Sequence, residues 1–317
     1  MPEGHSIHRY ARLHRALLGG RRVAASSPQG RFAAGACVLN GATLVDVEAY
    51  GKHLFYRFAS PDPERHAGRA HDGDVSLHVH LGLFGRFRAY ERDPLAPTPE
   101  TRLVLSAIGS HAPPRARASV SEPVGGDLVV RASVSEPVGG DLVVSASGPE
   151  LQLSGPTVCE LIDRDVEAAL RDRLGPDPLH GGDQTSVFAA LARRTAPIGQ
   201  VLLDQRVIAG IGNVYRAEVL FLVGVHPNRA AHAIDRGTLE RLWDLLRVLM
   251  TDGERRGRII TLQPPDRTRP LSELVSEEER LYVYNRAGRP CRRCGTPITS
   301  WSLAGRTIFA CRRCQPE

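Results

Sequence analysis

Lysine is almost absent from this chain, since Lys52 is the only lysine among 41 basic residues. Arginine fills the other positions. The guanidinium group of arginine is planar and always charged, whereas the ammonium group of lysine is compact and has a pKa that responds to its surroundings. Two explanations remain open at this point: a chemical need for an ammonium group at position 52, or a composition bias that left one lysine by chance.

Long apolar runs are also missing. The longest, such as VLFLVGV at 219–225, fall far short of the roughly 20 residues that cross a bilayer as a helix. The first 20 residues include Glu3, Arg9, Arg12 and Arg15, which does not fit a secretory signal. We therefore expect a cytoplasmic protein with no membrane partner.

Cysteine is scarce, with six in 317 residues, and four of them form one pattern near the end. Two C-x-x-C pairs, at 291–294 and 311–314, are separated by sixteen residues. This spacing predicts one zinc ion, which is expected to be structural because four thiolates leave no open coordination position. Two disulfides are the alternative, which a cytoplasmic compartment disfavours. The predicted ligands are Cys291, Cys294, Cys311 and Cys314.

Positive charge gathers at the same end. The net charge is +6, and from residue 286 onward seven arginines face one acid, Glu317, so that residues 1–285 are balanced. A local cationic surface favours a polyanionic partner, with nucleic acid first among the candidates. Arg306, at the turn of a hairpin expected over 297–310, is either a phosphate ligand or one of seven solvated arginines.

The length allows two domains, and the first part of the chain predicts a leading helix followed by short strands. Helical periodicity covers 6–18, with Ser6 as the N-cap. Cys37 and Cys159 are expected to be small buried residues. Strand patterns, separated by Gly, Pro and Asp as in a β-sandwich or barrel, cover 42–49, 53–58, 75–80 and 86–90.

Helical patterns dominate the chain from residue 157 onward. The turn AGIGN at 209–213 leads into a helix over 214–222 and puts bare backbone N–H groups at its N-terminus. This arrangement suits a phosphate, with the Asn213 side chain as a further donor. An ordinary turn that uses glycine for its φ angles is the alternative.

The loop LGLFG at 81–85 frames two apolar residues, Leu83 and Phe84, with glycines. Two interpretations are open. The side chains turn back into the core of a hairpin, or they protrude and fill the gap that remains when a base leaves a duplex.

A perfect tandem repeat occupies 117–144, where the 14 residues at 117–130 recur without change at 131–144. Two copies of this length are too few for a solenoid. We interpret the repeat as a duplicated surface loop, where extra length costs little free energy. Deletion of one copy is expected to leave folding and activity intact, and loss of soluble protein on that deletion would refute this interpretation.

The N-terminal residues Met1-Pro2-Glu3-Gly4 would present the secondary amine of Pro2 beside the Glu3 carboxyl once Met1 is removed. A chain-end amine titrates not far above neutrality, so part of it is an unprotonated nucleophile near neutral pH. A neighbouring carboxyl can handle its protons. Taken alone, however, these residues favour an ordinary chain end.

Together these motifs resemble the formamidopyrimidine-DNA glycosylase and endonuclease VIII family, and more closely its endonuclease VIII branch. The matching stretches are collinear and touch nearly the whole chain apart from the repeat. They are MPEG at 1–4, GKHLFY at 51–56, HLGLFGRF at 80–87, GPTVCELID at 155–163, PIGQVLLDQRVIAGIGNVYRAEVLF at 197–221, YVYNRAGRPC at 282–291 and GRTIFACRRCQ at 305–315.

The resemblance implies an α+β multidomain fold. An N-terminal β-sandwich domain with a leading helix would cover 1–154, and a helix–two-turn–helix DNA-binding domain 155–262. A linker or lesion loop over 263–285 would precede a four-cysteine zinc-finger β-hairpin over 286–317. The implied partner is double-stranded DNA with oxidised bases or abasic sites, bound by a monomer at the nucleoid.

The resemblance also implies catalytic roles. Pro2 would attack the sugar C1′ of a damaged nucleotide and expel the base as a Schiff base forms, with Glu3 as the general acid/base. Lys52 would contact phosphates around the lesion and support the chemistry electrostatically. Arg306 is included in this catalytic set. The implied activity is that of a bifunctional glycosylase and abasic-site lyase of base excision repair, which cuts the strand by β,δ-elimination.

The DNA contacts implied by the resemblance come from several loops. Asn213 and Arg306 would hold the phosphates that flank the flipped nucleotide. Leu83 would act as the wedge, with Phe84 beside it. One position departs from the family pattern: the family favours an acid at position 6, and Ser6 puts one supporting contact in doubt.

Two alternatives concern the activity. A glycosylase that prefers 8-oxoguanine or formamidopyrimidine would resemble relatives that use an Arg and a Phe from a second loop, and no such match appears in 101–150. The sequence therefore favours oxidised pyrimidines. A non-catalytic DNA-damage-binding protein is the second alternative, against which the presence of Pro2, Glu3 and Lys52 argues.

Overall fold

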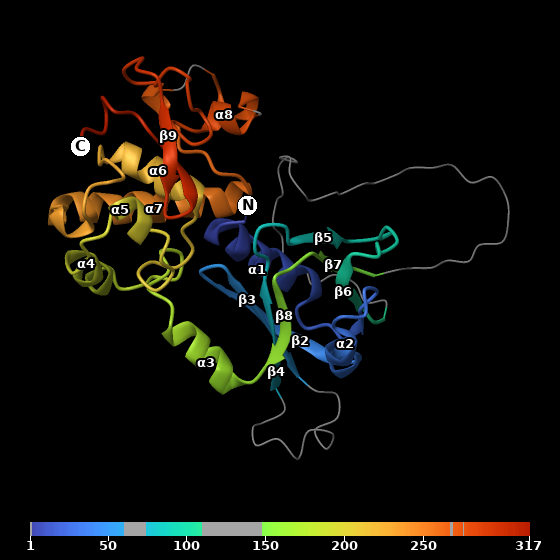
Figure 1. Ribbon diagram of the computed structural model, residues 1–317. Helices are drawn as coiled ribbons and strands as arrows, with labels where there is room; N and C mark the ends of the chain where they lie inside the picture. The colour runs from blue at the N-terminus through green and yellow to red at the C-terminus, as the bar shows by residue number, and fades with distance from the viewer. Residues whose placement is uncertain (1, 60–73, 110–147, 267–268, 275) are drawn as a thin grey trace, which may run out of the picture. The chain divides into compact units, whose positions relative to one another are not determined.

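The computed structural model describes residues 2–59, 74–109, 148–266, 269–274 and 276–317, so the repeat at 117–144 lies outside the described residues. The chain divides into two compact units (Figure 1). The first consists of Met1–Pro2, Tyr10–Ala49 and His53–Ala169. The second consists of Glu3–Arg9, Tyr50–Lys52 and Leu170–Glu317, so two short N-terminal stretches belong with the C-terminal part.

The first unit contains two four-stranded sheets, with strand orders β1-β6-β7-β5 and β2-β3-β4-β8. In β2 the buried positions Val47 and Ala49 are separated by partly exposed ones, as in a strand that buries one face. The strands are β1 (Val23–Ser26), β2 (Thr43–Tyr50), β3 (His53–Ala59), β4 (Asp74–His80), β5 (Arg86–Tyr90), β6 (Thr101–Ala107), β7 (Glu150–Ser154) and β8 (Val158–Ile162).

The two sheets meet through aromatic side chains. Tyr56 of β3 and Phe87 of β5 lie 6.3 Å apart between ring centroids. His14 of helix α1 (Gly4–Leu18) lies 4.6 Å from the ring of Phe87. Burial lowers the pKa of His14 to about 3, so the ring is neutral where it hydrogen bonds to the Tyr56 hydroxyl at 2.7 Å. This packing forms the β-sandwich predicted from the short strands.

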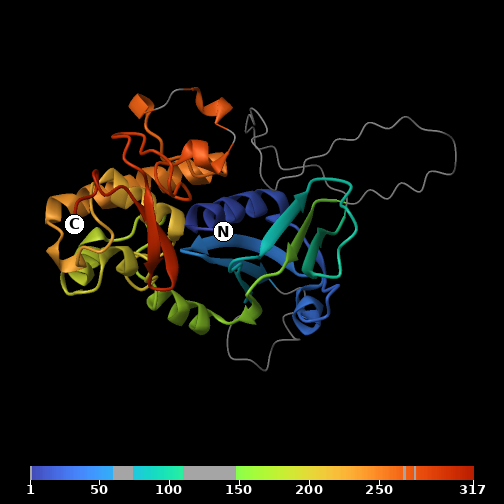
Figure 2. The same cartoon turned by 45° about the horizontal axis from the view of Figure 1, so that its top comes forward.

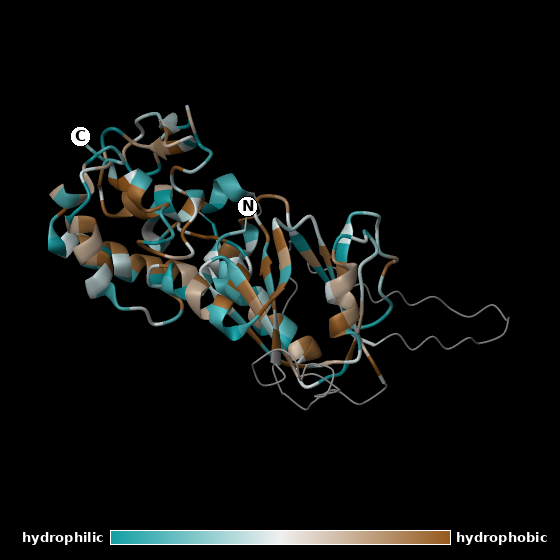
Figure 3. Cartoon of the chain, turned by 60° about the horizontal axis from the view of Figure 1, so that its bottom comes forward, coloured by the Kyte–Doolittle hydropathy of each residue, from teal (hydrophilic) through white to brown (hydrophobic). Residues whose placement is uncertain are grey.

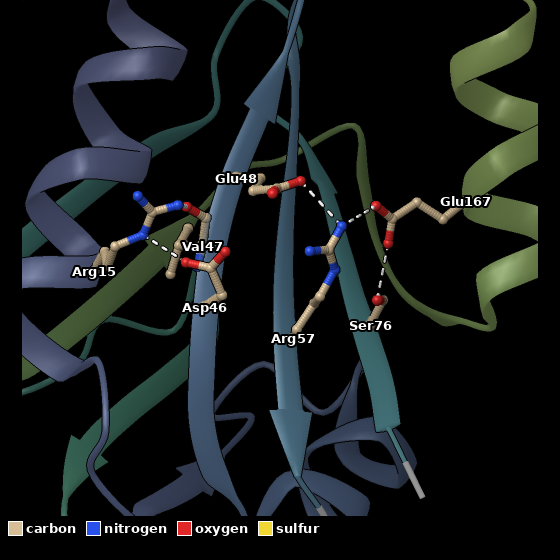
Figure 4. A network of polar contacts seen from close by, with 7 residues as sticks. All are labelled: Arg15, Asp46, Val47, Glu48, Arg57, Ser76 and Glu167. Atoms are coloured by element: carbon tan, nitrogen blue, oxygen red, sulfur yellow. Dashed lines mark hydrogen bonds and ion pairs between the residues drawn. The ribbon is translucent and has the colours of Figure 1, made fainter. Parts of the chain in front are cut away.

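Charged residues fix helix α3 (Arg164–Asp172) to the second sheet (Figure 4). Arg57 of β3 contacts Glu48 of β2 at 3.0 Å and Glu167 of α3 at 3.1 Å. The other oxygen of Glu167 accepts the Ser76 hydroxyl at 2.9 Å. The Glu167 carboxylate is buried, and these donors replace the water that it loses.

Three expectations for the first unit were wrong. The helix expected from residue 157 begins only at Arg164, because residues 158–162 pair with β4 as a strand, with Cys159 opposite Val79. Cys37, expected to be buried, is exposed. It lies on helix α2 (Ala33–Leu39), a helix that the sequence did not predict. Cys159 is only partly buried.

The second unit is built around helices. Their buried faces include Tyr215, Trp243 and Leu246 and form one apolar core. Apolar and polar bands alternate along these helices in Figure 3, as expected for helices with one buried face. Within the described ranges no helix is both long and apolar enough to span a membrane. The helices are α4 (Gln184–Ala192), α5 (Ile198–Val201), α6 (Asn213–Leu222), α7 (Arg236–Arg256) and α8 (Glu277–Arg280), with short 3₁₀ turns at Ala231–Ala233, Pro264–Asp266 and Leu271–Glu273.

A hairpin of β9 (Thr299–Leu303) and β10 (Arg306–Ala310) ends the chain, and its strands run side by side in Figure 2. Arg306 pairs with Leu303 across the turn, and the positive φ angles of Ala304 and Gly305 allow that turn. The hairpin confirms the prediction for this part of the chain. A second apolar cluster, which includes Phe221, Tyr282 and Ile308, joins it to α6.

Candidate active site

The carboxylate of Glu3 lies at the N-terminus of α6. Its Oε1 accepts the N–H of Val214 at 2.8 Å, and its Oε2 accepts those of Gly212 at 2.9 Å and Tyr215 at 3.4 Å. The backbone donors that the sequence assigned to a phosphate are therefore taken by the chain's own carboxylate, and that part of the prediction was wrong. The role of the Asn213 side chain as a DNA ligand stays a prediction.

Burial dominates the electrostatics of Glu3, which is fully inaccessible to solvent. Burial raises the pKa of the carboxyl, against the opposing effects of Lys52 and of the three backbone N–H groups. A carboxyl with a raised pKa keeps its proton to higher pH than a free one, as a general acid must.

The chain around Glu3 is fixed by backbone bonds. The Gly4 N–H donates to the Gly210 carbonyl at 2.8 Å, and the Glu3 carbonyl accepts the N–H groups of Ser6 at 2.9 Å and Ile7 at 3.3 Å. Helix α1 thus begins at Gly4, earlier than expected, and Ser6 is inside the helix rather than its N-cap. Since Pro2 is bonded directly to Glu3, these contacts restrict where its nitrogen can lie.

Three glycines allow the backbones near Glu3 to approach closely. A Cβ on Gly210 would lie 3.4 Å from the Gly4 Cα, 3.6 Å from the Gly51 Cα and 3.2 Å from the Met250 Cε. Gly51 and Gly210 also have φ angles of +57° and +91°, which side chains rarely tolerate. The start of α1, the turn before Lys52 and the turn before α6 therefore meet at one point.

Lys52, the single lysine, is partly buried at this point. Burial lowers the pKa of its ammonium group, Glu3 opposes that change, and Arg306 reinforces it. Glu3 and Lys52, two members of the predicted catalytic set, are thus close enough to shift each other's pKa, and Arg306 of the hairpin acts on the same ammonium.

Arg216, which was not among the residues predicted from the sequence, links the Asn213 side chain to strand β10, the strand that carries Arg306. Its guanidinium is fully buried and donates to Asn213 Oδ1 at 3.1 Å, to the Thr307 carbonyl at 3.1 Å and to the Gly199 carbonyl at 3.0 Å. Because the Asn213 oxygen is occupied, its NH₂ group is the part left to donate. Thr307 follows the exposed Arg306 in β10. The signal was an arginine three positions after Asn213, on the same helix face.

The four predicted zinc ligands come together in the second unit. The sulfur atoms of Cys291, Cys294, Cys311 and Cys314 all lie within 4.8 Å of one another, and no disulfide joins them. Over the described part of the chain, no other group of three or more His, Cys, Asp or Glu gathers its ligand atoms this closely. Four thiols in this arrangement fit a tetrahedral metal ion, and zinc is the ion that such sites prefer.

Leu83 and Phe84 belong to the first unit and protrude from it. Leu83 is 49% exposed and Phe84 is 82% exposed, which rules out the alternative that both turn back into the core. The loop is closed by the Gly85 N–H, which donates to the Leu81 carbonyl at 3.0 Å. Gly82 has a φ of +65°, and a Cβ there would collide with the Thr157 hydroxyl.

Comparison with known proteins matches most of the chain to two domain families. Residues 1–112 match the formamidopyrimidine-DNA glycosylase N-terminal domain, and residues 174–263 match the formamidopyrimidine-DNA glycosylase H2TH domain. Endonuclease 8 1 of Mycobacterium tuberculosis (strain ATCC 25618 / H37Rv) is 37% identical over 318 residues, covering 99% of this chain and 100% of the relative. Endonuclease 8 2 of Mycobacterium bovis is 30% identical over 327 residues, with the same coverage of 99% and 100%.

Solved structures agree in fold. Lactococcus lactis Fpg bound to DNA containing N7-benzyl-Fapy-dG matches with a TM-score of 0.71 at 20% identity, covering 100% of both chains. The same enzyme bound to DNA with an oxidised pyrimidine matches with a TM-score of 0.70, also at 20% identity and full coverage of both chains.

Proposed function

The chain belongs to the formamidopyrimidine-DNA glycosylase and endonuclease 8 family and is a DNA glycosylase with abasic-site lyase activity, and we propose that Pro2 is its nucleophile. The observation that supports this proposal most is the position of Glu3. Glu3 is a buried carboxyl with a raised pKa, it is hydrogen bonded to α6, and Lys52 is near enough to affect its pKa. It directly follows Pro2, which presents a secondary amine once Met1 is removed.

The proposed reaction begins when the Pro2 nitrogen, freed by removal of Met1, attacks C1′ of the damaged nucleotide. The N–C1′ bond forms as the glycosidic bond breaks, and the departing base takes the proton that the Pro2 nitrogen releases. Glu3 protonates the sugar ring oxygen, the ring opens, and an iminium remains on Pro2. Lys52 lies beside the negative charge that this transfer leaves on Glu3 and stabilises it.

Strand cleavage follows from the same iminium, which withdraws electrons from C2′. Loss of a C2′ proton expels the 3′ phosphate, and loss of a C4′ proton then expels the 5′ phosphate. Asn213 and Arg306 would hold the flanking phosphates, with the Asn213 amide oriented by Arg216. A zinc ion held by the four cysteines would keep the hairpin that carries Arg306 folded and would take no part in the reaction.

Oxidised pyrimidines are the proposed preferred bases. The protruding Leu83 and Phe84 would fill the gap left by the flipped base, and the full-length relatives at 37% identity carry the name endonuclease 8. Single-turnover excision rates on otherwise identical duplexes with thymine glycol, dihydrouracil or 8-oxoguanine test this. Faster excision of the two pyrimidines supports the proposal, and faster excision of 8-oxoguanine assigns the chain to the purine-preferring members instead.

The elimination steps are tested by the ends of the product. A duplex with one abasic site should yield phosphate at both sides of a one-nucleotide gap if β- and δ-elimination both occur. A 3′ unsaturated aldehyde as the final product would limit the enzyme to β-elimination. Intact abasic DNA would leave the chain as a non-catalytic member that binds damage.

A further inference from the structure

Asp177 is a fully buried carboxylate on the segment between α3 and α4, and the proposed reaction does not use it. Its Oδ2 lies 2.7 Å from the Gly51 nitrogen and 2.7 Å from His8 Nε2. Its Oδ1 accepts the Leu179 N–H at 2.9 Å. One carboxylate therefore binds three donors from three stretches that are far apart in the sequence.

The first two donors lead directly to the proposed active site. Gly51 immediately precedes Lys52, and His8 lies in the same helix, α1, that begins beside Glu3. Both donors share a single oxygen of Asp177, so the Lys52 turn and α1 are held to the same atom, and neither can move away from it without straining its own bond.

Tyr50 gives the Lys52 turn a second attachment to the same segment. Its hydroxyl donates to the Gly175 carbonyl at 3.1 Å, and its ring packs edge-on against His180 at 5.5 Å. Burial, together with the negative charge of Asp177, raises the pKa of Tyr50, so the hydroxyl remains a donor. The turn at Tyr50–Lys52 therefore packs against residues 175–180 and is hydrogen bonded to them.

We propose that Asp177 is a positioning residue for Lys52: by binding Gly51 and His8 together, it holds the Lys52 ammonium at a fixed distance from the Glu3 carboxyl. The inference rests on the proposed function, in which that pair acts during sugar ring opening. The lysine ammonium is carried on a flexible four-carbon side chain, and the position of its backbone sets the region that the ammonium can reach. Small displacements of a catalytic group cost large factors in rate.

An isosteric substitution tests the role without changing volume. Asp177→Asn offers one acceptor oxygen and one NH₂ group. When its NH₂ takes the position of Oδ2, the bonds to Gly51 and His8 are both lost. When it takes the position of Oδ1, the bond to Leu179 is lost. The matched control is Asp183→Asn at the exposed N-cap of α4, where asparagine caps as well as aspartate.

The measurement is single-turnover cleavage of abasic-site DNA at saturating enzyme. Asp177→Asn should slow cleavage on the order of tenfold, with a smaller change in affinity for uncleavable abasic-analogue DNA, and Asp183→Asn should match wild type. In a Lys52→Met background the same Asp177→Asn change should cost almost nothing, because the residue that it positions is gone. Equal losses in both backgrounds, or no loss in wild type, would overturn the inference.

His8 provides a second route if Asp177→Asn folds poorly. His8→Gln can donate from nearly the position of Nε2 and should keep the rate, whereas His8→Phe cannot donate and should lower it. Equal rates for the two variants would contradict the role of this contact. Wild-type protein that fails to cut abasic DNA would instead refute the proposed function, so the two failures are distinguishable.

Discussion

The Glu3 carboxylate and the Val214 N–H are joined by a hydrogen bond of 2.8 Å. This bond links the residue beside the proposed nucleophile to the first turn of α6, whose leading residue is the proposed phosphate ligand Asn213. The N-terminus of a helix carries a partial positive charge and is a common binding site for the anionic group of a ligand. Here it holds Glu3, the proposed general acid/base, so the same donors that stabilise the Glu3 anion also fix its position.

Glu3→Gln should abolish base excision and change the pH dependence of stability. Because the folded-state pKa of Glu3 is raised above 4.5, the folded protein binds this proton more tightly than the unfolded chain does. Wild-type stability should therefore fall as pH rises from about 4.5 through the raised pKa, and the variant should lack that fall. Urea denaturation of both proteins across this range measures the difference, and a constant difference would contradict it.

Lys52→Arg should lose activity although it keeps a positive charge. The pKa of Lys52 is lowered from 10.5 by burial, so wild-type cleavage should decline at alkaline pH below that value. Arginine does not titrate there and places a wider group near Arg306, so we expect on the order of a tenfold loss near neutral pH and no such alkaline decline. A pH–rate profile of both proteins tests this; identical profiles would exclude Lys52 as the titrating group.

Gly210→Ala should disrupt the meeting point of three backbones. Its φ of +91° is strained for alanine, and the added Cβ meets Met250, Gly4 and Gly51. We expect a loss of about 1–3 kcal/mol in the free energy of unfolding together with slower cleavage. Gly181→Ala is the control, since its φ is +70° but no atom lies within 4 Å of the new Cβ. That variant should lose stability through strain alone and keep its cleavage rate.

Purified protein should contain one zinc ion per chain, measurable by elemental analysis. Removal of the ion by chelation should unfold the β9–β10 hairpin and weaken DNA binding, because the four cysteines lie at both sides of that hairpin. Trp301 of β9 stacks on His226 at 5.4 Å, so its fluorescence reports the unfolding. Unchanged fluorescence and DNA affinity after complete zinc removal would contradict a structural role.

The sequence predicted those parts of the molecule in which local patterns decide the structure. The α1 helix, the strands β2 to β5 and the β9–β10 hairpin follow from periodicity and turn residues. Residues 158–162 were expected to be helical because their apolar positions also fit a helix, and pairing with β4 decided in favour of a strand. Such pairing is tertiary information that a local pattern does not contain.

The sequence allowed a set of candidate site residues to be proposed, but not the hydrogen bonds among them. Pro2, Glu3, Lys52, Asn213 and Arg306 were chosen for their chemistry and by resemblance. The bond from Glu3 to α6 joins residues more than 200 positions apart, so no local sequence motif can contain both of them. Asp177 gives no local signal for the same reason: in the sequence it is one of two acids, with Asp183, in the loop between α3 and α4.

Borohydride trapping on abasic-site DNA tests the central claim most directly. Protein with a free Pro2 should become covalently joined to the DNA. Protein that retains Met1 or carries an N-terminal tag should bind the DNA without being trapped, since it has no amine at Pro2. Equal trapping of the blocked protein would contradict the account and move the nucleophile elsewhere, with Lys52 as the next residue to examine.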